Sequence, residues 1–469
     1  MITVIDTLDE YSRMREVLRE NMDAIQLFLP SDINAHPCNN RISLIYYATP
    51  EKEWVMGQHH NDLPRMGIVR DGDPPNAYTL DGSFFRRFRF ISKDASYFVN
   101  PPHIHQWYNI GQREYHTKFH SVRNVNDAIP LVMHLRMFRE IAEKIWKHVD
   151  FMDGAPEWYP QTQDFYSRKL HYVLSELEEN GMAVNPKTFT EVYGDSHASR
   201  ALVGEYVYTK YNPYTLTGRP SNSWAGINFA AIPKKTGHRS SFVSRFGSTG
   251  RLVNFDFKSF HLFLLANYLG EDLPSEDVHT WLGCRYFNTD TLTPEQYEQS
   301  KVKTFGLLYG SERIEKGFLP FFDKVQSLRS ELWETYQNIG YVRSGHHSRP
   351  IHMDDPSENK VFNYWVQNLE TEVMVEIMYD MFSNKTDSRN GLTIANATPV
   401  EAFPILYTYD SVLFDCTEDD VDDLARKVLK VCKDHGYPVH IEVGANYGEM
   451  QSYRTYVTQR ALENYVLHL

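Results

Sequence analysis

Two aspartates, Asp256 and Asp410, each lie at the end of a β-rich apolar segment. Asp256 follows the run LVNF, and a helical pattern begins a few residues later. Asp410 lies between the segments ILYTY and VLFD, at the tip of a predicted β-hairpin. On adjacent strand ends, two such carboxylates could hold two Mg2+ ions side by side and support phosphoryl transfer. Each motif alone has a plainer alternative, because aspartate also caps helices and forms turns.

Lys301, Phe305 and Tyr309 recur at intervals of four residues within the segment SKVKTFGLLYGSE. This spacing places all three on one face of a predicted helix, which Gly310 would end. A lysine suits a triphosphate, and two neighbouring aromatic rings suit a base and a sugar, so the face could bind a nucleotide. The alternative is an amphipathic helix with an incidental lysine.

Positive charge is concentrated in residues 201–260, although the whole chain is acidic. The chain has 48 Lys and Arg against 61 Asp and Glu, a net charge of −13, whereas this segment has eight basic residues, two acidic ones and a net charge of +6. Tyrosine, phenylalanine and tryptophan interleave the basic residues. This composition suits a nucleic-acid groove, with a basic solvated face as the alternative.

The elements that would position these residues belong to a folded protein of 469 residues, 42% of them hydrophobic, which indicates about three domains. Helices are predicted at about 127–149 and 163–181, with a domain boundary in the Gly/Pro-rich break at 151–160. The pattern predicts an α+β body preceded by a smaller α/β domain. Four scattered cysteines indicate a reducing compartment, and no apolar run is long enough to span a membrane, so we expect a cytoplasmic protein.

Taken in order, these segments resemble the family-A DNA polymerases, the group that includes bacterial DNA polymerase I. The strand ending at Asp256, the K-x3-F-G-x2-Y-G pattern at 301–310 and the hairpin at Asp410 are similar to that family's motifs A, B and C. Further segments are similar to family segments in the same order: TGRPSN at 217–222, NFAAIP at 228–233, DVHTW at 277–281, NYWVQ at 363–367 and IEVGANYGEM at 441–450.

The resemblance implies a right-hand fold with palm, fingers and thumb. It implies an enzyme that adds dNTPs to a primer 3′-OH, directed by a template, through two-metal phosphoryl transfer. Asp256 and Asp410 would hold two Mg2+ ions, for which Mn2+ could substitute, and the backbone carbonyl of Phe257 would help. Lys301 would bind the triphosphate and act as a general acid. The implied partners are dNTPs and primer–template DNA.

The remaining site residues implied by the resemblance fall into two groups. Besides Lys301, the nucleotide would contact Phe305, Tyr309, His279, His261 and Phe257. The DNA would contact Arg219, Asn228, Asn363, Gln367 and Tyr409.

Several motif positions depart from the family pattern. His261 replaces the glutamate that usually screens out the ribose 2′-OH, and we expect the histidine to keep a preference for deoxynucleotides. Tyr297 replaces an arginine that usually contacts the triphosphate. Ser411 replaces the second carboxylate of motif C and is similar to the serine of the single-subunit RNA polymerases. Ala230 and Ala231 replace a glutamine and an asparagine, which weakens the expected grip on the template.

The thumb is expected to be short. Only roughly 20 residues separate the segments 176–189 and 208–219, where the family has a long helical pair, and helices rise about 1.5 Å per residue. We therefore expect low processivity, or a clamp partner that replaces the thumb.

The front of the chain resembles a 3′–5′ exonuclease domain that has lost its D-x-E and its other carboxylates. Without carboxylates such a domain cannot hold its metal ions, so we expect it to be inactive and proofreading to be absent. The predicted domains are a degenerate exonuclease-like domain at 1–150, a reduced thumb and connector at 151–215, and palm and fingers at 216–469.

The small size and divergent motifs suggest a phage-type polymerase, which would act in the host cytoplasm. Two alternatives stay open: a catalytically silent polymerase-like scaffold that binds DNA or a replication partner, and a single-subunit RNA polymerase. Retention of Asp256, Asp410 and Lys301 disfavours the silent scaffold. The RNA polymerase usually needs a longer front domain than the 150 residues predicted here.

Overall fold

The computed structural model divides the chain into two compact units. The first comprises Met1–Gly181, Tyr208–Thr215 and Pro220–Gly226, and the second comprises Met182–Val207, Leu216–Arg219 and Ile227–Leu469. The described residues are 2–5, 7–19, 25–30, 42–49, 51–57, 77–78, 162, 165–212, 215–234, 236–274, 277–312, 319–353, 355–382 and 401–467. The helix predicted at 127–149 and the boundary predicted at 151–160 lie outside them.

The first unit contains a mixed five-stranded sheet with the strand order β1-β4-β3-β2-β5. The pairs β1–β4 and β2–β5 are parallel, and the two pairs between them are antiparallel. Helix α1 follows β1 and buries Tyr11 and Met14. The bounds are β1 Ile2–Val4, α1 Leu8–Arg19, β2 Ile25–Pro30, β3 Ile42–Ala48, β4 Glu53–Gly57 and β5 Ala77–Tyr78.

The same unit contains helix α7, Leu170–Asn180, which continues from a π-helical turn at Phe165–Lys169. This helix and its end at Gly181 confirm the prediction for residues 163–181 over most of its length. The unit also contains a short antiparallel pair, β9 at Tyr211–Asn212 and β10 at Ser221–Trp224.

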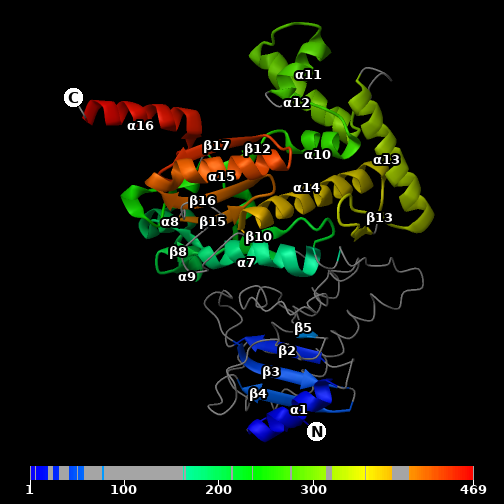
Figure 1. The fold of residues 1–469 in the computed structure, drawn as a ribbon, viewed down its shortest axis with the longest axis vertical. Coiled ribbons are helices and arrows are strands. Elements are labelled where there is room, and N and C mark those ends of the chain that lie inside the picture. The colour runs from blue at the N-terminus through cyan, green and yellow to red at the C-terminus, as the bar shows by residue number, and fades with distance from the viewer. Residues whose placement is uncertain are drawn as a thin grey trace. The chain divides into compact units, whose positions relative to one another are not determined.

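The second unit is built on an antiparallel five-stranded sheet with the order β15-β16-β12-β17-β18. Its three central strands are rich in buried Val, Leu, Ile and Phe, which is typical of strands covered by other elements. Helix α15 packs against β17, and α14 packs beside α15 (Figure 1). The bounds are β12 Gly250–Phe257, α14 Glu358–Phe382, β15 Ala402–Tyr407, β16 Ser411–Thr417, α15 Val421–Asp434, β17 Val439–Gly444 and β18 Gln451–Ser452.

Helices α10, α11, α12 and α13 lie between β12 and α14 along the described part of this unit. Helix α10 packs against α13 and α14, while α11 and α12 pack against each other as a pair (Figure 1). A capping box between Thr293 and Gln296 fixes the start of α12, and Gly310 ends that helix with a left-handed backbone. The bounds are α10 Phe260–Leu269, α11 Val278–Phe287, α12 Pro294–Tyr309 and α13 Pro320–Ile339.

The other described elements of the second unit are mostly short. Residues 190–207 hold the end of α8, all of α9 and a small hairpin, so this segment contains no long helical pair. Within the described residues, no helix is both long and apolar enough to cross a membrane. The bounds are β6 Met182–Ala183, α8 Pro186–Tyr193, α9 Asp195–Ala201, β7 Leu202–Val203, β8 Tyr206–Val207, β11 Ile227–Asn228, β13 Val342–Arg343, β14 Pro350–Ile351 and α16 Tyr453–Leu467, with 3-10 turns at Phe229–Ala231, Arg239–Ser241, Gly247–Thr249 and Glu418–Asp420.

Candidate functional site

The two predicted aspartates lie side by side at the end of the central sheet. Strand β12 pairs with β16 in a register that places Asp256 opposite Ser411. The backbone N–H of Phe257 donates to the backbone carbonyl of Asp410 at 2.8 Å. As predicted, Asp410 occupies the turn of the β15–β16 hairpin, where Tyr409 adopts a left-handed backbone with φ of 64°. Strand pairing therefore fixes the two aspartate backbones relative to each other.

The surroundings of these aspartates disfavour negative charge. Burial raises the pKa of Asp256 to about 6, and the nearby carboxylates of Asp410 and Glu442 add to this effect. Asp410 is exposed at the turn, yet the protein packed around it partly desolvates its carboxylate and, together with Glu370, raises its pKa. Among the described residues, neither carboxylate has a cation within ion-pair distance. More distant cations offset only part of the negative charge, Lys234 at Asp256 and Arg219 at Asp410.

Glu442 is a nearby acidic residue that the sequence interpretation did not single out. It lies on β17 opposite Asn254 of β12, and the Asn254 amide donates to it at 3.4 Å. Asn254 and Asp256 are two residues apart on one strand, so they and Glu442 share one face of the sheet. Among the described residues, no three His, Cys, Asp or Glu side chains are grouped closely enough to hold a metal ion by themselves.

The predicted nucleotide face forms on α12. The rings of Phe305 and Tyr309 are nearly parallel, with an interplanar angle of 8° and centroids 6.4 Å apart. Lys301 pairs with Glu298 at 3.0 Å and lies 4.3 Å from the ring centre of Tyr297, the residue that replaces the expected arginine. The hydrogen bond that Lys301 donates to Glu298 raises the pKa of Lys301, which therefore stays positively charged.

His279 on α11 joins this face. Its ring is buried and lies 5.8 Å, centre to centre, from the ring of Phe305. The Ser300 hydroxyl donates to the backbone carbonyl of His279 at 2.7 Å, which fixes α11 against α12. Burial lowers the pKa of His279, so its imidazole is neutral at pH 7. Its Nδ1 atom is buried and has no hydrogen-bond partner among the described residues.

His261, at the start of α10, lies within a buried polar cluster. Its Nδ1 is hydrogen-bonded to the Tyr309 hydroxyl, and its Nε2 lies 3.2 Å from Oε1 of Glu370. Glu370 also pairs with Arg219, with Nε 2.9 Å from Oε2 and Nη2 donating to Oε1 at 3.2 Å. The Arg219 guanidinium lies over the Tyr409 ring, 3.5 Å from its centre. We call these five residues the Glu370 cluster.

The sequence interpretation identified four members of this cluster but not Glu370. Its only trace in the sequence is an acidic residue three positions after Gln367, within the long helix α14. The two other predicted DNA contacts on α14, Asn363 and Gln367, are hydrogen-bonded to each other at 3.3 Å. Asn228 instead caps a 3-10 turn by accepting from the Ala230 N–H at 3.1 Å.

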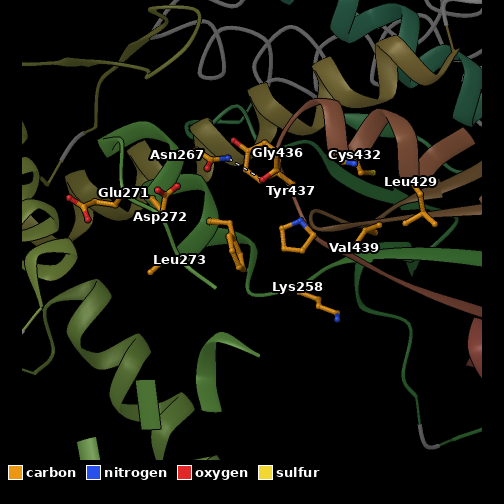
Figure 2. A pocket seen from close by; sticks show the side chains of 14 residues that line it. Lys258, Asn267, Glu271, Asp272, Leu273, Leu429, Cys432, Gly436, Tyr437 and Val439 are labelled. Atoms are coloured by element: carbon orange, nitrogen blue, oxygen red, sulfur yellow. Dashed lines mark hydrogen bonds between the residues drawn. The ribbon is translucent and has the colours of Figure 1, made fainter. Parts of the chain in front are cut away.

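A separate hollow of about 560 Å3 lies between α10, α15 and the start of β17 (Figure 2). Tyr437, Gly436 and Asn267 line it together with apolar side chains such as Val439. Lys258 contributes to it, but neither predicted metal aspartate nor any predicted nucleotide-binding residue does. This hollow is therefore distinct from the aspartate site.

Comparison with known proteins places the fold but not a family. No model of a known protein family matches the chain, and no curated protein matches it in sequence. In structure the chain is similar to the POL domain of Pol1 from M. smegmatis, which was solved in complex with DNA primer–template and dNTP. The TM-score is 0.66 at 13% sequence identity, covering 96% of this chain and 99% of that one.

This likeness defines the class of fold. The chain has the α+β fold of a polymerase domain of the Pol1 type, as the motif order predicted.

Proposed function

We propose that the chain is a DNA-directed DNA polymerase that adds dNTPs to a primer 3′-OH by two-metal phosphoryl transfer. The observation that carries this proposal is the placement of Asp256 and Asp410 on adjacent strand ends, within a fold similar to a polymerase domain. The fold alone does not imply an activity, so the proposal depends on the chemistry of this site.

The donor set fits Mg2+, with Mn2+ as a substitute. Two carboxylates with raised pKa values and no ion-pair partner among the described residues are hard oxygen ligands whose charge a divalent ion would offset. Asp256 and Asp410 would hold the ions with help from the Phe257 carbonyl, leaving positions for phosphate oxygens and water. Bound ions would supply activation of the 3′-OH and stabilisation of the leaving pyrophosphate.

The incoming dNTP would lie along α12. Lys301 would bind the triphosphate, exchanging its exposed partner Glu298 for phosphate, and would supply a proton to the leaving group. Phe305 and Tyr309 offer parallel rings for the base and sugar. The neutral ring of His279 could donate a hydrogen bond to the β-phosphate, which would satisfy a ring nitrogen that otherwise lacks a partner among the described residues.

The primer–template would contact Arg219, Tyr409, Asn363 and Gln367 near the growing end, with Asn228 at the upstream turn. Residues 201–260 carry a net charge of +6, which would attract the phosphate backbone. The short segment at 190–207 supports low processivity or a clamp partner. Absence of proofreading and a phage-type origin stay predictions from the sequence.

The test is extension of a labelled primer on a DNA template with Mg2+, giving dNTPs and rNTPs separately. We expect extension with dNTPs, abolished in Asp256→Ala and Asp410→Ala but retained in Asp434→Ala, an exposed aspartate at the end of α15. Equal activity in all four proteins would refute the assigned site. Extension with rNTPs alone would favour the RNA polymerase alternative.

A silent scaffold is the second candidate, because Ser411 replaces the second carboxylate of motif C and is buried in the structure. Binding of primer–template by the wild type, with no extension under any metal, would support it.

A further inference from the structure

Glu370 is a buried carboxylate that joins three parts of the second unit. Its side chain is 2% exposed. It extends from α14 toward Arg219, in the loop before β10, and toward His261, at the start of α10. Through His261 it is linked to Tyr309 at the end of α12. A carboxylate this deeply buried is retained only when its charge is paired and hydrogen-bonded.

Arg219 supplies that pairing. Its guanidinium donates one hydrogen bond, from Nη2 to Oε1 of Glu370, and its Nε lies at an ion-pair distance of 2.9 Å from Oε2, so Arg219 offsets the charge of the buried carboxylate. The Tyr409 ring covers the guanidinium from the hairpin turn. The hydrogen bond from the Asn368 amide to the Thr217 carbonyl at 2.8 Å anchors the loop that carries Arg219 to the same helix. Glu370 is thus held in place independently of His261.

His261 has a partner at each edge of its ring: its Nδ1 is hydrogen-bonded to the Tyr309 hydroxyl, and its Nε2 lies at ion-pair distance from the Glu370 carboxylate. Nε2 lies 3.2 Å from Oε1 of Glu370 without hydrogen-bond geometry, and a proton on Nε2 would be attracted to this carboxylate and leave Nδ1 as an acceptor. Burial and the charge of Glu370 raise the pKa of Tyr309, whose hydroxyl therefore keeps its proton and donates to Nδ1. A histidine without these two partners would be free to change rotamer.

The location of this ring matters for the sugar of the nucleotide. A nucleotide with its triphosphate at Lys301, its base on α12 and its α-phosphate beside Asp256 would place its sugar between Tyr309 and the end of β12. His261 begins α10 just after that strand and touches Tyr309.

We infer that Glu370 is the positioning residue of a sugar gate, holding the His261 ring where a ribose 2′-OH would have to lie. The inference rests on the proposed polymerase function. His261 on α10 has no carboxylate of its own, and Glu370 on α14 supplies one beside it. Selectivity between dNTP and rNTP then depends on a residue that does not touch the nucleotide.

The experiment measures incorporation of single dNTPs and rNTPs by wild type, Glu370→Gln, Glu370→Ala, His261→Ala and the Glu370→Ala/His261→Ala double variant. We expect Glu370→Ala and His261→Ala each to lower discrimination about 10-fold to 100-fold, mainly through faster rNTP incorporation. The double variant should lose no more than the larger single loss, because the two residues act as a unit. Glu370→Gln keeps the shape of the side chain and should lose less.

Glu372→Gln is the matched control. Glu372 lies two residues along α14, is equally buried, and accepts from the Ser344 hydroxyl at 2.5 Å and from the backbone N–H groups of His346 and His347. We expect this variant to lose stability without a change in discrimination. If Glu370→Gln and Glu370→Ala slow dNTP and rNTP incorporation equally, as a purely structural role requires, the inference is overturned.

Binding separates this inference from the proposed function. The affinities of dNTP and rNTP are measured on complexes with a dideoxy-terminated primer, with melting temperatures recorded for each variant. A wild type that binds dNTP selectively but never extends a primer refutes the function, while loss of that selectivity in Glu370→Gln still supports the gate. A wild type that binds dNTP and rNTP equally, or binds neither, refutes the gate.

Discussion

The aspartate site on the central sheet and the nucleotide face on α12 are held in contrasting ways. Asp256 lies on β12, which is paired on both sides by β16 and β17, and Asp410 is tied to it through the Phe257 backbone. On α12, in contrast, Phe305 is 40% exposed and Lys301 has an exposed partner, Glu298. The sheet holds charges close together before any ligand arrives, whereas the helix offers groups that can exchange partners.

A rigid sheet suits metal binding, and an open helix face suits nucleotide binding. Metal ligands must keep a fixed separation through each catalytic cycle, and strand pairing supplies that rigidity at the cost of unfavourable charge. A nucleotide must enter and leave at each step, so its binding face has to be open. Substitutions in the two regions should therefore differ in their effects on stability and on nucleotide binding.

The largest expected effect is on the aspartates. Asp256→Asn and Asp410→Asn should each lower the extension rate at least about 1,000-fold, because an amide cannot replace a carboxylate in holding a divalent ion. In contrast to activity, the thermal stability of the metal-free protein should rise in Asp256→Asn. Its folded pKa of about 6 lies above the ordinary value of 3.8, so the metal-free protein loses stability as the pH rises between these two values, and the full loss is present above pH 6.

The measurement is calorimetric melting with EDTA between pH 5 and pH 8. Asp256→Asn should melt higher than wild type at pH 8, and the difference should shrink as pH falls through 6 and Asp256 becomes protonated. With Mg2+ added, the wild type should gain stability and Asp256→Asn should not. A lower melting temperature for Asp256→Asn at pH 8 would show that this carboxylate is not under electrostatic strain.

Lys301→Ala should lower kcat/KM for dNTP about 100-fold, through loss of one charge-assisted contact to the triphosphate. Its melting temperature should change little, since an exposed pair such as Lys301–Glu298 contributes about 0–1 kcal/mol. Lys303→Ala is the control: Lys303 lies two residues away and 4.9 Å from the Tyr286 ring. Equal losses in the two variants would mean that α12 contributes only general positive charge.

The ends of two helices offer a comparison of stability. Gly310 ends α12 and Gly270 ends α10, both with left-handed backbones. A Cβ at Gly270 would meet open space, so Gly270→Ala should cost about 1 kcal/mol from backbone strain alone. A Cβ at Gly310 would clash with the Arg329 guanidinium and the Asn359 side chain, so Gly310→Ala should cost about 2 kcal/mol more. Urea unfolding of both variants measures the difference, and equal costs would contradict the close packing behind α12.

The sequence could predict both regions because each depends on local patterns. A strand end and a hairpin turn locate Asp256 and Asp410, and a spacing of four residues locates the face of α12. Glu370 could not be found in this way, because Arg219 lies 151 residues from it in sequence. Helix α14 is buried on most of its surface, so its periodicity does not show which side faces the site. For Asn228 a motif match predicts a DNA contact, and the structure adds a local role that the motif does not reveal, because its side chain caps a 3-10 turn.

The smallest expected effect concerns the exposed side chains of α12. Phe305→Ala should weaken dNTP binding about tenfold, because stacking of a base on an aromatic ring is worth roughly 1–3 kcal/mol. Val302 is 69% exposed on the same helix but does not share the spacing of the nucleotide face, so Val302→Ala should leave binding unchanged. Both substitutions remove exposed apolar surface, so neither should alter the melting temperature appreciably. Equal nucleotide affinities for the two variants, measured on a dideoxy-terminated primer–template, would show that Phe305 faces solvent without a ligand. In that case Tyr309 and the other residues of the Glu370 cluster, rather than Phe305, would be the nucleotide-binding groups to compare with the rigid metal site.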